Sequence, residues 1–430
     1  MHDHASVRVD CVGLSVPQLL RRQMLQLGSA GLLGVAFPSW LEAGPQDRRA
    51  PKRVAAITTV WFPTSHADVL IGKLLDGYDH AGGPGPNLTL SSLFLDDPES
   101  SQMGLAKAKQ HNVRLAGTIE ECITLGTDSV AVDGVLLIGE LGSYPKNTKG
   151  QIYYPRPRMF EDIVATFRKY GKVVPVFNDK HLAYNWHNAK WIYDTAVEMK
   201  IPFMAGSSLP VFRRDPPLWL PLGCEVEEAM VIGFSGLESY GFHTMEALQC
   251  QLERRRGGET GVKAVQTLTG AEVWQAEKEG RWSRELYDAI TATFPEGSRG
   301  SPESKLGTGE FVLIEYCDGT KATLANLEDH AKWGVGAKLK GQSRPLATWY
   351  HGLYRTGWPV FANQLRAIEK MIHTGRPSYP VERTLLTTGI IDAAMTSRFE
   401  FHRRQETSHL EAVHYEPGDY PFENDSAADG

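Results

Sequence analysis

The sequence predicts an α/β chain in which a doubly wound parallel sheet is followed by an α+β domain with an open, mostly antiparallel sheet. Short apolar or β-branched runs alternate with helical patterns from residue 52 to residue 206, at the spacing of βαβ units. Beyond residue 206 this alternation stops. A later pair of runs at 311–327, joined by Asp318-Gly319, has the pattern of a hairpin. These observations predict a parallel sheet first and a mixed α and β region second.

The first region, residues 52–206, is expected to form a Rossmann-like sheet of the dinucleotide-binding type. Its expected strands are the runs at 53–61, 88–95, 113–117, 132–139, 173–177 and 202–205. Its expected helices lie around 69–75 and at 102–111, 119–125, 159–170 and 189–200. Strands of this composition are typical of a sheet that is covered by helices on both faces.

The second region, residues 207–400, is expected to be a substrate and oligomerisation domain whose sheet covers the mouth of the first. Helices are expected at 243–255, 283–294, 359–373 and 381–398, and a strand-like stretch at 262–276. Residues 401–430 form a polar tail.

Composition excludes several classes of protein. A chain of 430 residues is long enough for two domains. Its net charge is −6, without a basic stripe, so a nucleic-acid partner is not expected. Because no apolar stretch reaches the roughly 20 residues that a membrane span needs, stable membrane insertion is not expected. The cysteines form no CxxC pair, and buried thiols are expected.

Residues 1–43 have the features of a twin-arginine signal peptide. Arg21-Arg22 precede a modest apolar run at 27–40 that glycines dilute, and a weak small-residue cleavage site follows. The alternative is an amphipathic N-terminal helix. A leader of this type predicts a periplasmic or otherwise extracytoplasmic protein that folds, often around a cofactor, before export.

Four stretches carry a resemblance to a known family. They are 118–121 with 132–135, the segment 171–183, the segment 240–246, and 374–377 with 389–394. In this order they resemble the glucose–fructose oxidoreductase / inositol dehydrogenase family (Gfo/Idh/MocA) over most of residues 52–400. The resemblance implies an oxidoreductase that acts on a sugar or polyol with NAD or NADP as cofactor. It also implies a homo-oligomer.

Two departures from the family pattern affect the redox machinery. The first βα turn, Val60–His66, contains no glycine, although the family uses glycines there to let the backbone approach a pyrophosphate. Ser239 stands where the family often has an aspartate. An alternative therefore stays open: a chain that has lost the dinucleotide and acts as a carbohydrate-binding protein or a hydrolase or lyase, possibly with a metal.

The resemblance implies three catalytic residues. Lys180 would contact both cofactor and sugar hydroxyl, and His243 would be the general acid or base. Glu246 lies one helical turn after His243 and would orient it or bind a substrate hydroxyl. The structural alternatives are a surface lysine, a core histidine and a salt-bridged glutamate.

Six further residues are expected to contact the cofactor from the turn after the first strand and from later strand ends. They are Thr64, Ser65, His66, Asp96, Asp97 and Glu140. Ligand-type side chains near strand ends, namely His66, Asp68, Glu140, Asp179, His181, His243 and Glu246, would suit a divalent metal. Because the sequence has no HxxxH, HExxH or similar local motif, no metal site is predicted.

Overall fold

The computed structural model describes residues 50–295, 309–327, 331–352, 358 and 360–418. The expected leader, residues 1–43, lies outside these ranges, as does the end of the polar tail. Among the residues described, no helix is both long and apolar enough to cross a membrane.

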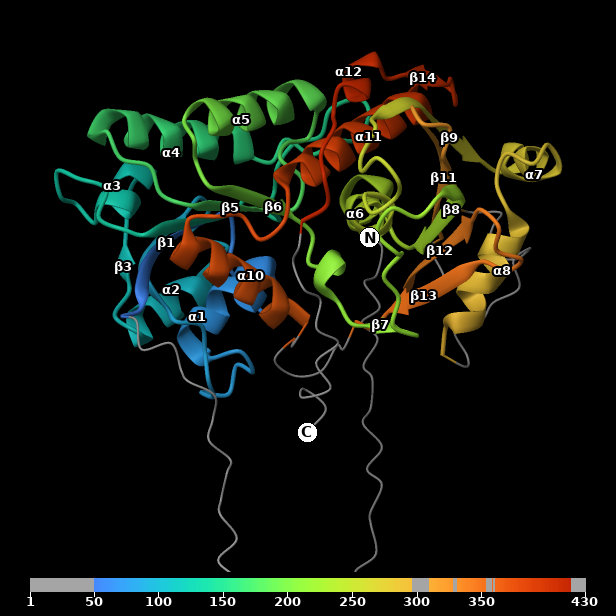
Figure 1. Ribbon diagram of the computed structural model, residues 1–430. Helices are drawn as coiled ribbons and strands as arrows, with labels where there is room; N and C mark the ends of the chain where they lie inside the picture. The colour runs from blue at the N-terminus through green and yellow to red at the C-terminus, as the bar shows by residue number, and fades with distance from the viewer. Residues whose placement is uncertain (1–49, 296–308, 328–330, 353–357, 359, 419–430) are drawn as a thin grey trace, which may run out of the picture. The chain divides into compact units, whose positions relative to one another are not determined.

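The first sheet contains six parallel strands in the order β3-β2-β1-β4-β5-β6 (Figure 1). They are β1 (Lys52–Thr58), β2 (Leu88–Leu95), β3 (Arg114–Leu115), β4 (Gly134–Ile138), β5 (Val176–Asp179) and β6 (Phe203–Gly206). This order confirms the predicted doubly wound, Rossmann-like sheet. The strand order reverses between β1 and β4, and ligands of such sheets bind at the carboxyl ends of the strands at that reversal.

Helices cover both faces of this sheet because its strands are apolar on both sides. From the first half of the chain come η1 (Ala67–Ile71, a π-helical turn), α1 (Gly72–Asp76), α2 (Gln102–Gln110), α3 (Ile119–Thr124), α4 (Arg156–Tyr170) and α5 (Trp186–Glu198). Along β1, Ala55 and Ile57 pack with α3, α4 and α5, whereas Val54 and Ala56 pack on the opposite side with η1.

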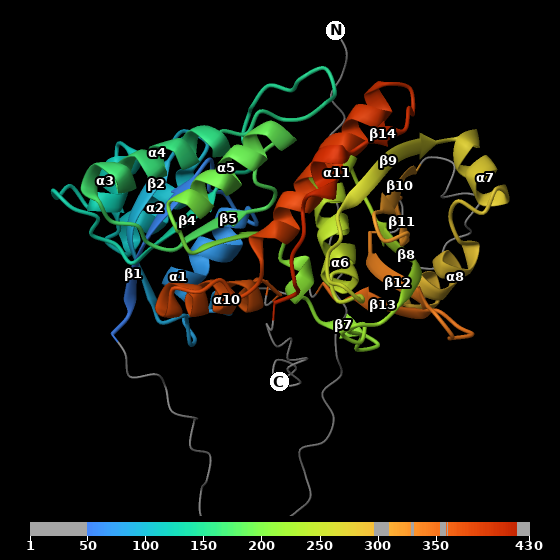
Figure 2. The ribbon, with the colours of Figure 1, turned by 45° about the horizontal axis from the view of Figure 1, so that its top comes forward.

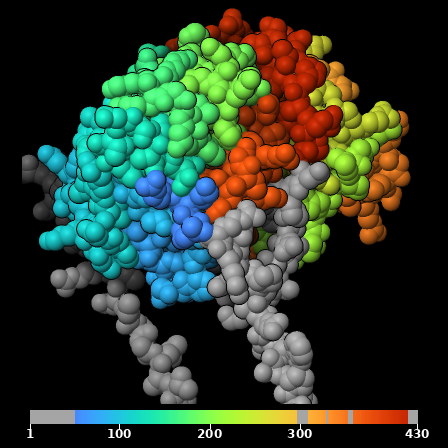
Figure 3. Space-filling view, turned by 60° about the vertical axis from the view of Figure 1, so that its left-hand side comes forward, coloured from blue at the N-terminus to red at the C-terminus, as the bar shows by residue number. Residues whose placement is uncertain are grey.

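A helix from the second half of the chain completes that opposite side. α10 (Val360–Thr374) places Leu365, Ile368 and Met371 in the same buried cluster as Val54 of β1. In Figure 3 the orange-red surface of the C-terminal helices lies directly against the blue and green surface of the first half. The two halves therefore share one of their hydrophobic cores.

The second sheet contains eight strands in the order β14-β9-β10-β11-β8-β12-β13-β7. They are β7 (Arg214–Asp215), β8 (Val226–Gly233), β9 (Val262–Thr269), β10 (Glu310–Tyr316), β11 (Lys321–Asn326), β12 (Trp333–Leu339), β13 (Leu346–Tyr350) and β14 (Gln405–Glu406). Every neighbouring pair is antiparallel except β11 with β8, which confirms the open, mostly antiparallel sheet. The predicted hairpin is β10–β11, and Gly319 in its turn has φ +89°.

Helices lie on both faces of this sheet as well (Figure 2). α6 (Phe242–Leu252) and α11 (Val381–Phe399) pack on the side toward the first sheet, and α11 also contacts α5 and β6. α7 (Ala271–Lys278) and α8 (Arg284–Thr293) cover the other side. The strand-like stretch expected at 262–276 is therefore partly wrong: β9 ends at Thr269, and Gly270, at φ +56°, starts the turn into α7.

The residues after α11 dock onto the second sheet. β14 pairs with β9, and α12 (Ser408–Glu411) buries Leu410. The four cysteines of the described ranges are free thiols: Cys122 and Cys250 are buried as expected, Cys224 is half-buried, and Cys317, in the β10–β11 turn, is exposed.

Candidate active site

A cavity of about 380 Å³ lies at the carboxyl ends of the first-sheet strands. Its polar lining includes His66, Glu140, Lys180 and His243. Aromatic side chains form much of the remaining wall: Tyr154, Phe212, Tyr240, Trp333 and Phe361. The lining comes from both halves of the chain. Tyr240 lies just before α6 and His243 in its first turn, whereas His66 follows β1 and Glu140 follows β4.

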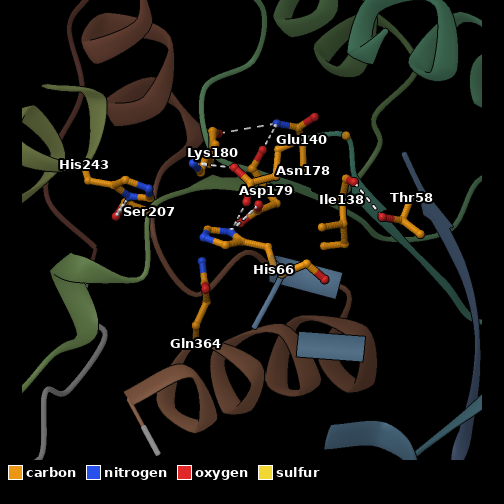
Figure 4. Close-up of polar contacts among 12 residues, drawn as sticks. Thr58, His66, Ile138, Glu140, Asn178, Asp179, Lys180, Ser207, His243 and Gln364 are labelled. Atoms are coloured by element: carbon orange, nitrogen blue, oxygen red, sulfur yellow. Dashed lines mark hydrogen bonds and ion pairs between the residues drawn. The ribbon is translucent and has the colours of Figure 1, made fainter. Parts of the chain in front are cut away.

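Four polar side chains converge at one edge of the first sheet (Figure 4). Nδ1 of His66 lies 2.7 Å from Oδ2 of Asp179 and 3.2 Å from Oε1 of Glu140. The other Glu140 oxygen, Oε2, forms an ion pair with Nζ of Lys180. His66 follows β1, Glu140 follows β4, Asp179 ends β5 and Lys180 is the next residue. They meet because the carboxyl ends of parallel strands lie at the same edge of a sheet.

Lys180 is held in place by its backbone as well as by its charge. It has φ +61°, in the left-handed region that is uncommon for residues other than glycine, and its N–H donates to the Gly206 carbonyl at 3.1 Å. Burial alone would lower the Lys180 pKa, but the negative charges of Glu140 and Asp179 outweigh it and raise the pKa above its ordinary value. Lys180 therefore remains a cation at neutral pH.

His243, the second residue of α6, has the opposite protonation state. Burial lowers the pKa of its imidazole well below the ordinary value, and the charge of Lys180 lowers it further. Its Nδ1 lies 2.6 Å from Oγ of Ser207, which also accepts a hydrogen bond from the Leu209 N–H at 3.0 Å. At neutral pH His243 is a neutral imidazole that can accept a proton.

Glu246 lies one turn after His243 and is fully buried behind it. It is not among the described residues that line the cavity. Its carboxylate accepts hydrogen bonds from Thr387 Oγ1 at 2.7 Å and Thr384 Oγ1 at 3.2 Å, with the Ser207 N–H at 3.5 Å. Burial raises the Glu246 pKa to about 7. Glu246 thus supports the Ser207 segment that contacts His243 and does not touch His243 itself.

The first βα turn already uses its own hydrogen-bond donors. The Thr64 N–H donates to the Asp68 carboxylate at 2.9 Å, and the Phe62 N–H donates to Oγ of Ser65 at 3.3 Å. The Trp61 N–H donates to Oγ of Ser101 at 3.0 Å. Asp68 places a negative charge in the first helical turn, where a nucleotide phosphate would need a positive field. The turn therefore has no glycine that would let a phosphate approach the backbone. The Asp68 carboxylate lies where a phosphate would bind.

The two aspartates expected at an adenosine ribose are also engaged elsewhere. Asp96 accepts from the Tyr144 hydroxyl at 2.8 Å and from Arg158 at 2.5 Å. Asp97 accepts from the Ser100 N–H at 3.1 Å. The residues present thus do not fit the adenosine and phosphate parts of a nicotinamide dinucleotide, although the shape of the fold allows one.

The structure brings together five of the nine residues predicted to form the site. Thr64, His66, Glu140, Lys180 and His243 line the cavity. Ser65, Asp96, Asp97 and Glu246 belong to supporting contacts around it.

Sequence reasoning missed several supporting residues. Arg156 at the start of α4 is completely buried and donates to the Gly139 carbonyl at 2.8 Å and the His181 carbonyl at 3.1 Å, so it fixes the ends of β4 and β5. Ser207 was also missed. Arg156 and Ser207 belong to no recognisable sequence motif. Asp179, in contrast, was named as a possible metal ligand because it lies near a strand end.

The comparisons with known proteins identify the fold. No family model matches the sequence, and no curated protein does. Solved structures do match. GenD2 from gentamicin A biosynthesis, in complex with NAD, is 14% identical with a TM-score of 0.51, and the match covers 84% of this chain and 98% of that one. Apo scyllo-inositol dehydrogenase from Lactobacillus casei is 10% identical with a TM-score of 0.52, covering 83% and 98%.

A third similar structure contains both cofactor and substrate. Myo-inositol dehydrogenase from Lactobacillus casei, in complex with NAD(H) and myo-inositol, is 13% identical with a TM-score of 0.50, covering 83% of this chain and 96% of that one. These likenesses confirm, at the level of the fold, the resemblance seen in the sequence.

The buried Glu246 gives a prediction about stability and pH. Because its pKa is about 7 in the folded chain and 4.5 ordinarily, the folded chain holds a proton that the unfolded chain releases between these values. Its contribution to stability therefore falls as pH rises from 5 to 8, and Glu246→Gln should remove this loss. We expect the unfolding free energy of the variant minus that of the wild type to rise over this range by up to about 3 kcal/mol, measured by urea denaturation.

A matched control is Glu198→Gln on the exposed side of α5, which should show no such pH trend. A flat difference for Glu246→Gln would mean that this carboxyl is ionised in the folded chain across the range.

Proposed function

We propose that this chain, which has the fold of the Gfo/Idh/MocA-type oxidoreductases, is an enzyme that converts a sugar or polyol by proton transfer without a bound dinucleotide. The observation that carries this proposal is the pair of groups facing one cavity, a neutral His243 and a cationic Lys180. One can take a proton and the other can stabilise the negative charge that results.

The walls of the cavity support a sugar or polyol as substrate. Tyr154, Tyr240 and Trp333 present aromatic faces on which the C–H face of a sugar ring packs. The polar groups of His66, Glu140 and Lys180 supply the donors and acceptors that hydroxyls require. A volume of about 380 Å³ lies within the range of small-molecule sites. The myo-inositol complex of the Lactobacillus casei enzyme, with the same fold, supports this substrate class.

The chain's own residues account for one acid–base step. His243 removes a proton from a substrate hydroxyl or from a carbon beside a carbonyl, with Ser207 fixing the orientation of the ring. Lys180 donates a hydrogen bond to the oxygen on which negative charge develops, and Glu140 holds the ammonium group in place. In an elimination, the base takes the proton from a carbon beside a carbonyl and the group on the next carbon leaves with its bonding electron pair. In a hydrolysis, the base takes a proton from the attacking water, and the cleaved oxygen leaves as a hydroxyl. The proposed class is therefore a lyase or hydrolase.

A nicotinamide-dependent sugar or polyol dehydrogenase is the second candidate. The fold shared with NAD-bound dehydrogenases favours it, and Lys180 and His243 would serve its proton transfer equally well. The engaged donors of the first βα turn and the Asp68 carboxylate count against it.

The two candidates differ in whether they need a dinucleotide. We expect that denaturing the natively purified full chain releases no nicotinamide dinucleotide detectable by mass spectrometry, and that titration with NAD or NADP gives no binding heat in calorimetry. The reason is that the phosphates would meet a carboxylate and bonded amides. Release of about one dinucleotide per chain would instead establish the dehydrogenase candidate.

Replacement of the proposed base tests the catalytic assignment. In a screen of sugars, keto-sugars and polyols, His243→Asn should lower kcat by about 100-fold or more, because a positioned general base contributes factors of this size. His111→Asn is the matched control, since His111 pairs with Asp76 outside the cavity. Equal turnover by His243→Asn and wild type on the same substrate would exclude His243 as the base.

We also propose that the chain is exported through the twin-arginine route, on the strength of Arg21-Arg22 and the apolar run that follows. Arg21→Lys together with Arg22→Lys should leave the precursor uncleaved in the cytoplasmic fraction, measured by cell fractionation and the mass of the chain. The unmodified chain should appear, shortened, in the extracytoplasmic fraction. Equal export of both would point to the amphipathic-helix alternative.

A further inference from the structure

Three potential metal ligands lie together beside the cavity, which two of them, His66 and Glu140, line. They are Nδ1 of His66, an oxygen of Glu140 and an oxygen of Asp179, all within 4.8 Å of one another. The Glu140 and Asp179 side chains are 2% and 1% exposed, and that of His66 is 15% exposed. Each comes from a different segment of the chain, so no local sequence motif marks the group.

We propose that His66, Glu140 and Asp179 bind one divalent first-row transition-metal ion, such as Zn²⁺ or Mn²⁺. An imidazole with two carboxylates is a donor set that such ions accept. Ligands held about 2.1 Å from a metal lie about 3 Å apart when their bonds meet at a right angle. The 3.2 Å from Nδ1 of His66 to Glu140 is close to this spacing, and the 2.7 Å to Asp179 is that of a hydrogen bond, which a bound ion would replace.

The second carboxylate oxygen of Asp179 is an independent observation in favour of a bound cation. Asp179 Oδ1 is buried and has no hydrogen-bond partner among the described residues. An unpaired buried carboxylate oxygen is costly, and native structures rarely keep one without a partner, a water or an ion. A cation between His66 and the two carboxylates would neutralise both acids and compensate the cost at Asp179.

The surroundings hold the three ligands in the orientation that a metal needs. Lys180 pairs with Oε2 of Glu140 and leaves Oε1 toward His66. On the other side of the His66 ring, Figure 4 shows Gln364 with its amide nitrogen nearer the ring. This nitrogen donates to the Gly206 carbonyl at 3.2 Å, so Gln364 is fixed beside β6.

The remaining coordination positions of the ion would open toward the cavity, which His66 and Glu140 line. Hydroxyl or carbonyl oxygens of a small polar ligand are suitable occupants. A metal in this position would act as a Lewis acid on the same oxygen that Lys180 reaches. The binding site itself does not depend on the proposed function, because metal binding can be measured without turnover.

The alternative is a protonated His66 that forms ion pairs with both carboxylates and leaves no room for a cation. The test uses the full chain, purified without chelator or affinity metal. Its metal content is measured by mass spectrometry, and the chelator-treated chain is then titrated with Mn²⁺ or Zn²⁺ alone by calorimetry. Electron paramagnetic resonance of Mn²⁺ gives a second readout. We expect one ion per chain, and at least 100-fold weaker binding in Asp179→Asn and His66→Ala.

The matched control is His402→Ala. His402 forms an equally close pair with one carboxylate, Nδ1 to Glu272 at 2.6 Å, but has no second acid in a three-ligand group of the described chain. The His402→Ala variant should bind the ion with the same affinity as the wild type. Circular dichroism checks that each variant is folded. Absence of metal in the purified wild type together with no saturable binding would overturn the proposal, as would binding that Asp179→Asn and His66→Ala leave unchanged.

Discussion

The arrangement of the site depends on a requirement for charge balance at the carboxyl edge of the first sheet. Glu140, Asp179 and Lys180 are almost completely withdrawn from water there. Buried charges are tolerated only when they are paired and hydrogen-bonded, and removing one partner is costly. Lys180, at φ +61°, forms an ion pair with Glu140, and Nδ1 of His66 contacts both acids. The elements that carry these residues cannot shift independently without separating charges.

The same edge shows how a dinucleotide-type fold can carry a first turn of different chemistry. In this chain the first turn folds on itself through Ser65 and Asp68, and the bulky Trp61 packs against α2 beside Gly104, where an added Cβ would come within 2.9 Å of the indole side chain. The turn that attracts phosphate in other folds of this type holds the Asp68 carboxylate here. The crevice at the strand ends is still present. Its position follows from the topology of the sheet and not from the identity of the ligand.

Much of the first sheet followed from the sequence because its strands are short apolar runs separated by helices. The second sheet was harder. β8 carries two glutamates directly after its first residue. β12 contains Gly334 and Gly336, whose missing side chains make room for Ile290 of α8 and for Phe294, the residue after it. Such glycines weaken the sequence pattern of a strand, and they are needed because side chains some 40 residues earlier in the chain pack against them. Only the assembled packing shows it.

The candidate site shows the same division. Glu140 was predictable because it follows a strand and His66 because it lies in the turn after one, and strand ends meet at one edge. Lys180 was predictable from the resemblance of the segment 171–183 to a family motif. Ser207 was not, since its importance comes from a contact with His243 that no local pattern records. The grouping of His66 with Asp179, 113 positions apart, likewise became visible only in three dimensions.

The position of α10 has a consequence for the order in which the chain acquires its structure during synthesis. All six strands of the first sheet have been made once residue 206 emerges, yet α10, which completes the covering of one face of that sheet, ends only at Thr374. At typical rates of synthesis this interval lasts roughly 10–30 s. Throughout it, apolar residues such as Val54 and Leu136 lack the share of their buried surroundings that α10 later supplies. The first sheet therefore acquires its complete hydrophobic core only after α10, late in the chain, has been made.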